Sequence, residues 1–472
     1  MRPNIIIIVV DALRADHVGC YGGERTPFMD QFASEGGLFE DAYCTWNTTD
    51  QSLTSILTGR YPLSHGIVHH GDKVEAEDFR AFRNSGARLL SEVLGENDYY
   101  TMAVDWMGRW FSRGFDCYGY PSVGGLMRKL RLYLRYMLNH IEIFQCYKSY
   151  GQDGGGSWFE DVRGVLNTFL FSRELALVQD AEYVTDSAID RMENAADDPF
   201  FLLLHYWDVH TPYNSPPRFR GYRGSDPEQR LLDRYRGSAR YVDEQLGRLF
   251  GWMDDRGLYD DTVVVVTSDH GESLTEHGIY FDHHGLYDVN THVPLLLRYP
   301  RSLPAGQRIG GFVQHVDLVP TLLALSEIDF EDCLCDGENL LNAIDNGRSD
   351  RFCAYSEESY VQKKRSIRTD RYRYITAVDG DGYCRYCHTV HEGVEELYDL
   401  SADPEEKNNV VENRPEVARR LRQKLQGMVG RLETPHAGPN DGFREHEGDP
   451  EFLSEQEQEE LKKRLESLGY HG

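Results

Sequence analysis

Asp269 and His270 stand side by side in the stretch "SDHGE", where a carboxylate and an imidazole could bind one divalent cation. Asp11 ends the apolar run "NIIIIVVD" and could add a second carboxylate. The hydroxyl of Thr49 would complete a set of three or four ligands and leave one position for a substrate. These residues predict a metal site whose ligands come from three distant parts of the chain.

Thr49 lies at the start of a predicted helix. In "NTTDQSLTSILTGRYP", Asp50 and Ser52 occupy the first turn, and Gly59 ends the helix. A hydroxyl at this position faces free backbone N–H groups and the positive end of the helix dipole, where phosphate or sulfate binds well. The alternative is that Thr48 or Thr49 only caps the helix, as threonine often does. The helix alone does not decide between a cap and a nucleophile.

The candidate ligands follow short apolar runs that have no polar alternation. Three of these runs end near Asp11, His210 and Asp269, and a fourth is "HVPLLLRYP". Such runs are typical of strands that are buried on both faces of a parallel sheet, and ligands of these sheets bind beyond the carboxyl ends of the strands. We therefore predict an α/β fold with a large mixed, mostly parallel sheet flanked by helices on both faces. The three residues should meet in one crevice.

Helical patterns fall between the predicted strands, at 26–36, 174–195 and 234–257. After about residue 330 the pattern changes to short alternating strands and turns. The predicted domains are a catalytic α/β domain at 1–330 with an insertion at about 120–175, a smaller C-terminal α+β subdomain with a short antiparallel sheet at 331–431, and a linker with a terminal helix at 432–472.

The acidic composition limits the partners of the protein. With 50 basic and 78 acidic residues the formal net charge is −28, which argues against nucleic-acid binding because a polyanion would be repelled. Arg outnumbers Lys and Asp is frequent, a bias typical of salt-loving organisms, although an ordinary acidic protein is an equal alternative. The first apolar run is too short for a signal peptide or a membrane span, so we expect a cytoplasmic location.

Two features stand outside this scheme. The segment 127–150 places Arg and Lys among Leu, Tyr and Met. It could make a peripheral contact with an anionic membrane, although a packed helix within an insertion is the preferred interpretation. Cys333, Cys335, Cys384 and Cys387 are candidates for a structural zinc site, with no metal as the alternative. The oligomeric state is left open.

The longest motifs resemble the sulfatase family of the alkaline phosphatase superfamily. The matching stretches include "PNIIIIVVDALRADHVGCYGG", "TTDQSLTSILTGRYPLSHGI", "LLLHYWDVHTPY" and "VVVVTSDHGESLTEHGIYFDHHGLYD", and "ELYDLSADPEEKNNV" resembles the C-terminal subdomain of that family. The resemblance covers most of residues 3–410, apart from the insertion. It implies an alkaline phosphatase-like fold and an ester hydrolase that uses a divalent metal ion, with Ca, Mg, Mn and Zn as candidates.

The resemblance also implies roles for individual residues. It makes Asp11, Asp269 and His270 metal ligands, and it places Thr49 at the nucleophile position. His210 matches a histidine that contacts the anionic group of the substrate. In two-metal members of the superfamily an Asp precedes such a histidine by more than two residues, so the D-x-H spacing of "DVH" favours a single metal ion.

Three further histidines are candidates for contacts with the substrate. In "DHHGLYD", His284 is preferred as the catalytic residue, because it directly precedes the glycine as in related transferases. His283 falls where many sulfatases have a lysine and is assigned to substrate binding. His277 is a second substrate-binding candidate, with support of the pocket as its alternative. His205 lies inside an apolar run and is expected to be an ordinary core histidine.

The sequence departs from the family at the nucleophile and beside it. Sulfatases follow the first metal aspartate with a second, and here that residue is Ala12. They carry a cysteine or serine that becomes formylglycine, followed by a proline and an arginine. Here the three positions are Thr49, Gln51 and Leu53, and threonine cannot become an aldehyde. Cys44 is out of register and is rejected as a substitute. We therefore expect no formylglycine.

The leading hypothesis is a metal-dependent hydrolase that cleaves sulfuric or phosphoric esters by in-line attack of metal-activated Thr49. The family favours sulfate, whereas a threonine nucleophile resembles the phosphodiesterases and nucleotide pyrophosphatases of the superfamily. The first alternative is a transferase that moves a phosphoethanolamine-type or phosphoglycerol-type headgroup onto a glycan or lipid. The second is a non-catalytic binding protein with a decayed site. The expected substrate is a small-molecule, glycan or lipid ester.

Overall fold

The computed structural model describes most of the chain. The described residues are 2–119, 135, 180–195, 199–221, 226–329, 334–378 and 393–433. The predicted terminal helix within 432–472, nearly all of the basic segment 127–150, and three of the four zinc-candidate cysteines lie outside this set. Those predictions are therefore untested. No helix among the described residues has the length and apolar character needed to cross a membrane.

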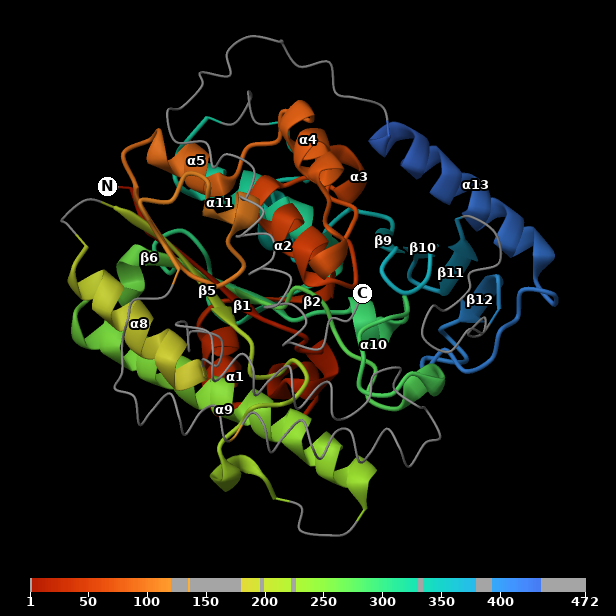
Figure 1. Ribbon diagram of the computed structural model, residues 1–472, viewed down its shortest axis with the longest axis horizontal. Coiled ribbons are helices and arrows are strands. Elements are labelled where there is room, and N and C mark those ends of the chain that lie inside the picture. The colour runs from red at the N-terminus through yellow and green to blue at the C-terminus, as the bar shows by residue number, and fades with distance from the viewer. Residues whose placement is uncertain are drawn as a thin grey trace.

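Eight strands of the described chain form one large sheet (Figure 1). Their order across the sheet is β4 (Cys117–Tyr118), β3 (Tyr100–Val104), β5 (Phe200–Tyr206), β1 (Asn4–Val10), β6 (Thr262–Thr267), β7 (Leu295–Arg298), β2 (Gly37–Tyr43) and β8 (Gln307–Gln314). The five strands from β4 to β6 are parallel, β7 is antiparallel to both of its neighbours, and β2 and β8 are parallel. The predicted mixed, mostly parallel sheet is confirmed.

Each face of the sheet carries its own hydrophobic core. Ile7 of β1 packs into one core and Ile8 into the other, because successive side chains of a strand point to opposite faces. The first core lies under α2 (Thr49–Thr58), α4 (Ala76–Asn84), α5 (Leu90–Gly95), α11 (Leu318–Leu325) and α12 (Leu341–Asn346). The second lies under α1 (Pro27–Glu35), α8 (Ala181–Glu193) and α9 (Pro227–Asp255). This burial on both faces explains why the central strands are continuously apolar.

The predicted helices differ from the observed ones mainly at their ends. The helix at 26–36 is α1, with Thr26 as N-cap and Gly36 as C-cap. The helix predicted at 234–257 is α9, which begins earlier because Asp226 caps it and Pro227 occupies its first position. The helix predicted at 174–195 corresponds to α8 over its described part.

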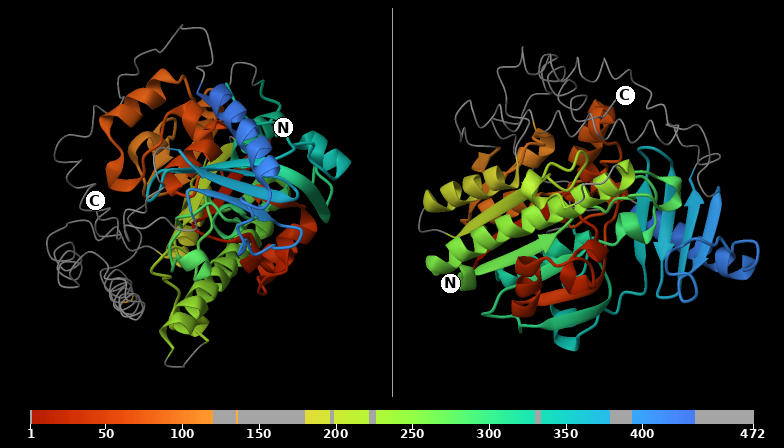
Figure 2. Two further views of the ribbon diagram at one scale, coloured as in Figure 1. Left: turned by 90° about the vertical axis from the view of Figure 1, so that its right-hand side faces the viewer. Right: turned by 90° about the horizontal axis from the view of Figure 1, so that it is seen from below.

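A four-stranded antiparallel sheet forms the C-terminal subdomain (Figure 2). Its strands are β9 (Ala354–Glu358), β10 (Lys364–Arg368), β11 (Tyr372–Ala377) and β12 (Glu395–Asp399), and α13 (Pro415–Leu432) packs on it. The short helix α3 (Pro62–His65) follows α2, and α10 (Asp288–Thr291) precedes β7. Tyr61, just after α2, belongs to the same apolar cluster as Leu421 of α13. The subdomain therefore packs directly against the segment that follows α2.

Candidate active site

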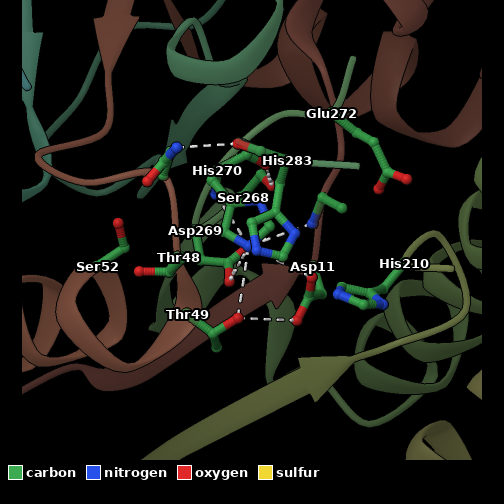
Figure 3. Close-up of polar contacts among 12 residues, drawn as sticks. Asp11, Thr48, Thr49, Ser52, His210, Ser268, Asp269, His270, Glu272 and His283 are labelled. Atoms are coloured by element: carbon green, nitrogen blue, oxygen red, sulfur yellow. Dashed lines mark hydrogen bonds and ion pairs between the residues drawn. The ribbon is translucent and has the colours of Figure 1, made fainter. Parts of the chain in front are cut away.

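The central strands bring the predicted ligands together at one edge of the sheet. β1 lies between β5 and β6 and is parallel to both. Asp11 directly follows β1, whereas Asp269 and His270 follow β6, and all three residues are fully buried. Figure 3 shows the three side chains converging with Thr49 and His210. The crevice expected at the carboxyl ends of the parallel strands is thus where these residues lie.

Thr49 is the first residue of α2, and its hydroxyl faces the ligands. Its Oγ1 lies 3.4 Å from Asp11 Oδ2 and 3.4 Å from His270 Nε2. Thr48 is the N-cap residue, but its hydroxyl donates to Gln51 Oε1 (2.5 Å) and makes no capping bond to the backbone. A role of Thr49 as a simple helix cap therefore has no support in the geometry, since its side chain points to a carboxylate and an imidazole.

The buried carboxylates of Asp11 and Asp269 lie close together, and not all of their oxygens have a hydrogen-bond donor among the described residues. Asp269 Oδ1 accepts hydrogen bonds from the backbone N–H groups of Ala12 (3.2 Å) and His270 (2.9 Å), which fixes its orientation. Asp11 Oδ1 and Asp269 Oδ2 have no hydrogen-bond partner within the described part of the chain. Buried carboxylate oxygens of this kind are costly unless a cation or a proton compensates them. The residues present therefore fit a divalent ion.

The two carboxylates also differ in their electrostatics. Burial by itself would raise the pKa of Asp11, but nearby histidines, His210 first, lower it well below its usual range. Burial, together with the negative charge of Asp11, raises the pKa of Asp269. A divalent ion between them would favour ionisation of both.

Three histidine rings line the pocket beside these carboxylates. The ring of His283 lies 4.7 Å from that of His270 and 5.7 Å from that of His210, measured between centroids. Burial and the charge of His270 lower the pKa of His283 well below its usual range. An anion placed beside these rings would favour the protonated form of His283. The group is therefore suited to bind an anionic ester.

The other two predicted histidines lie in different surroundings. His284 is directed to Asp282, with 3.2 Å between Nδ1 and Oδ1. His277 stacks on the ring of Tyr287 with centroids 3.5 Å apart. Thus His283, rather than the preferred His284, makes the ring contacts with His270 and His210. The catalytic role of His284 and the substrate-binding role of His277 stay predictions.

Sequence reasoning missed a role for His205. This residue of β5 is fully buried, as expected for a core histidine. However, its Nδ1 lies 2.9 Å from Asp105 Oδ1, and its Nε2 lies 3.5 Å from Asp11 Oδ2. Burial would lower the pKa of His205, but the carboxylates of Asp105 and Asp11 raise it to about 10. One atom each from Asp11, His205 and Asp269 lie within 4.8 Å of one another, so the three could share a metal ion.

A second cluster of charged side chains lies around Asp50, next to Thr49 in the chain. Asp50, the residue after Thr49, accepts a hydrogen bond from Arg109 Nη1 (2.9 Å) and pairs with His70 Nδ1 (3.0 Å). Burial would raise the pKa of Asp50, but Arg109 and His70 lower it to about 2. His70, from the stretch "HHG", is buried as well. The cluster fixes the first turn of α2.

Known proteins of similar sequence and fold are sulfatases and related esterases. The family model for sulfatases matches residues 3–328, and the model for the C-terminal part of N-sulphoglucosamine sulphohydrolase matches residues 275–431. An N-acetylgalactosamine-6-O-sulfatase of Bacteroides thetaiotaomicron is 25% identical over 91% of this chain and 94% of its own.

Solved structures extend the similarity to the fold. A structure in complex with its substrate D-glucosamine-2-N,6-O-disulfate has a TM-score of 0.67 and 20% identity, covering 93% of this chain and all of the other. The phosphonate monoester hydrolase of Agrobacterium radiobacter has a TM-score of 0.64 and 18% identity, covering 91% of this chain and 96% of its own. With the sheet, the buried carboxylates and the matched regions together, the chain belongs to the sulfatase family, whose fold is that of the alkaline phosphatase superfamily.

Proposed function

We propose that the protein hydrolyses a sulfuric or phosphoric ester with Thr49 as the nucleophile. The observation that carries this proposal is the position of the Thr49 hydroxyl, 3.4 Å from both Asp11 and His270 at the N-terminus of α2. An anionic ester group would bind at this point because the free N–H groups and the dipole of the helix attract it. The nucleophile would then lie beside the atom that it attacks.

Asp11, Asp269 and His270 would hold a single divalent ion, and the hydroxyl of Thr49 would be a further ligand. When bound, the ion would neutralise charge on the transferred group and lower the pKa of the attacking hydroxyl. The side chains supply the remaining chemistry. His210 and His283 would orient the non-bridging oxygens of the ester and donate a proton to its leaving group.

In the proposed reaction, Thr49 Oγ1 forms a bond to sulfur or phosphorus while the bond to the leaving oxygen breaks. The hydroxyl proton is released to solvent, and the leaving oxygen gains a proton from His210 or His283. Water then attacks the same sulfur or phosphorus atom, which restores the threonine hydroxyl and releases sulfate or phosphate. One proton of this water passes to Thr49 Oγ1, and the other returns to the histidine that protonated the leaving oxygen.

The atom that Thr49 attacks would be either the sulfur of a sulfate ester or the phosphorus of a phosphate ester. The relatives support a sulfate ester of a sugar, since one of them is a sulfatase of N-acetylgalactosamine. The threonine supports a phosphorus ester, because a threonine adduct cannot use the chemistry of a formylglycine hydrate. A headgroup transferase would use the same first step and differ only in its acceptor. No contact among the described residues favours that alternative, since the basic segment 127–150 lies almost entirely outside them.

A parallel assay of four ester classes tests the proposed function. The full-length protein is incubated with an aryl sulfate, a phosphate monoester, a phosphodiester and a phosphonate monoester, each with Ca, Mg, Mn or Zn at low and high salt. We expect turnover of at least one ester that depends on the added metal. A rate that rises when an alcohol acceptor is added would favour the transferase. The absence of turnover with every ester and metal would contradict both.

A further inference from the structure

The further inference concerns His205, which interrupts the apolar strand β5. It lies between Leu204 and Tyr206 and has no exposed surface. An imidazole in such a position costs free energy unless both ring nitrogens have partners. The position of each nitrogen therefore indicates why a histidine is present at this point.

Asp105 holds one side of the ring. It directly follows β3, the strand next to β5, and is itself fully buried. Its Oδ1 lies 2.9 Å from His205 Nδ1, while its Oδ2 accepts hydrogen bonds from the backbone N–H of Met107 (3.1 Å) and from the hydroxyl of Tyr118. With both carboxylate oxygens engaged, Asp105 fixes the orientation of the imidazole and directs its Nε2 away from itself. A carboxylate behind the distal nitrogen is the usual arrangement for a histidine that binds a metal.

The other ring nitrogen faces the candidate metal site. His205 Nε2 lies 3.5 Å from Asp11 Oδ2 and makes no hydrogen bond among the described residues. It forms a compact group with an oxygen of Asp11 and an oxygen of Asp269, each within 4.8 Å of the others. Two ligand atoms that each lie about 2 Å from one metal are at most about 4 Å apart, and the 3.5 Å between His205 Nε2 and Asp11 Oδ2 fits this limit.

We propose that His205 is a nitrogen ligand of the metal ion and that Asp105 is the positioning residue behind it. Together with His270, this gives the site two imidazoles beside two carboxylates. Imidazole favours Zn and other transition metals, whereas Ca and Mg prefer oxygen ligands. The site therefore selects a transition metal such as Zn over Ca. This inference rests on the proposed metal-dependent function, since it names further ligands of the same ion.

The backbone beside Asp11 is consistent with a ligand supplied by β5. Ala12 follows Asp11, is fully buried, and has a left-handed conformation with φ of 58°. That conformation is uncommon for alanine and is tolerated better by aspartate or asparagine. Ala12 offers no side-chain ligand, whereas His205 lies within reach on the neighbouring strand. An aspartate introduced at position 12 should therefore provide an oxygen ligand in a variant that lacks the His205 imidazole.

Metal binding by the chelator-stripped full chain tests this inference without any substrate. Calorimetric titration gives the affinities for Zn²⁺ and Ca²⁺, and pulsed electron paramagnetic resonance of the Cu²⁺-loaded protein counts the coordinated imidazoles. The wild type should show two imidazoles per ion, and His205→Asn should show one. His205→Asn should weaken Zn²⁺ binding by at least about tenfold and change Ca²⁺ binding much less.

Asp105→Asn separates positioning from ligation. It should weaken Zn²⁺ binding by about 10- to 100-fold while two imidazoles remain coordinated. Asp116→Asn is the matched control, because Asp116 also accepts hydrogen bonds beside β3, from Thr101, but lies away from the ligands. This control should leave the affinity unchanged. The combination of Ala12→Asp with His205→Asn should restore binding with a preference shifted towards Ca²⁺.

The outcomes separate the inference from the proposed function. An unchanged imidazole count and unchanged Zn²⁺ affinity in His205→Asn would overturn the inference while leaving a metal-dependent Thr49 enzyme intact. A wild type that binds none of the tested ions would overturn both. Thermal unfolding of each stripped variant shows whether it folds, and a variant that fails to fold is replaced by His205→Gln, for which the same loss of one imidazole is expected.

Discussion

The hydroxyl oxygen of Thr49 lies 3.4 Å from Oδ2 of Asp11, although 38 positions separate the two residues in the sequence. This contact joins the N-terminus of α2 to the carboxyl end of β1. It brings a hydroxyl group, the N-terminus of a helix and a buried carboxylate to one point, and anions bind well at such a helix N-terminus. The predictions below follow from this arrangement and from the buried charges around it.

Removal of the Thr49 hydroxyl should abolish turnover. Thr49→Ala should lower kcat by about 10³-fold or more, because a covalent route cannot proceed without its nucleophile. Thr49→Ser should keep measurable turnover, since it retains a hydroxyl at the same place. Steady-state kinetics with the best ester of the panel measures both. Thr48→Ala is the matched control and should retain most activity, and full activity in Thr49→Ala would exclude Thr49 as the nucleophile.

The two adjacent histidines of "DHHGLYD" should respond differently to substitution. His283→Ala should lower kcat by about 10²-fold or more, because His283 contacts His270 and His210 beside the reacting group. The loss should be largest for esters with poor leaving groups, which need a proton most. The same substitution at His284, which faces Asp282, should have the smaller effect. The reverse order of the two effects would restore His284 as the catalytic residue.

Neutralising Asp50 should destabilise the protein. Asp50→Asn leaves the guanidinium of Arg109 buried without its counter-charge, and the loss of one partner of a buried pair costs about 3–5 kcal/mol. Chemical denaturation measures the change in the free energy of unfolding. Glu416→Gln, which removes the exposed pair between Glu416 and Arg419, is the control and should change stability little. Equal effects of the two substitutions would contradict the role assigned to the buried pair.

A buried carboxyl group between two helices should make stability depend on pH. Asp243 of α9 accepts hydrogen bonds from the backbone N–H groups of Phe28 (3.3 Å) and Met29 (2.8 Å) of α1. Burial raises its pKa to about 6. Because the folded state holds the proton more tightly, the stabilisation is complete below about pH 4 and is lost as the pH rises through 6.

Asp243→Asn removes this titration. The free energy of unfolding of the variant, relative to the wild type, should rise by up to about 3 kcal/mol between pH 4 and pH 7. Urea unfolding at a series of pH values measures the difference. Asp254→Asn, at an exposed position of the same helix, is the control and should follow the wild type. A difference that is independent of pH would show that Asp243 does not titrate with this pKa.

The fold and the meeting of Asp11, Asp269 and His270 at one edge of the sheet could be predicted where the sequence pattern has one physical cause. β1, β5 and β6 are buried on both faces and are therefore continuously apolar, so the polar residues that follow them stand out. The bounds of α2 could also be predicted. Its end was clear because Gly59 takes the left-handed conformation that ends the helix.

The remaining parts of the site depend on contacts that no local pattern encodes. His205 looks like any histidine in an apolar strand, and only the pairing of β3 with β5 brings Asp105 to its ring. The choice between His283 and His284 depends on the direction of two adjacent side chains in a loop. His70 is buried because it pairs with Asp50, which lies 20 positions earlier in the chain. Such partners appear only once the sheet and its loops are assembled.

Identification of a covalent adduct tests the central claim most directly. The protein is mixed with excess of its best ester, quenched in acid within the first turnovers, digested and examined by mass spectrometry. We expect one phosphoryl or sulfuryl group on the peptide that contains Thr49, none in Thr49→Ala, and loss of the group on continued incubation. An adduct on any other residue would contradict the account. Turnover without any adduct, under conditions in which hydrolysis of the Thr49 adduct is the slow step, would contradict it as well.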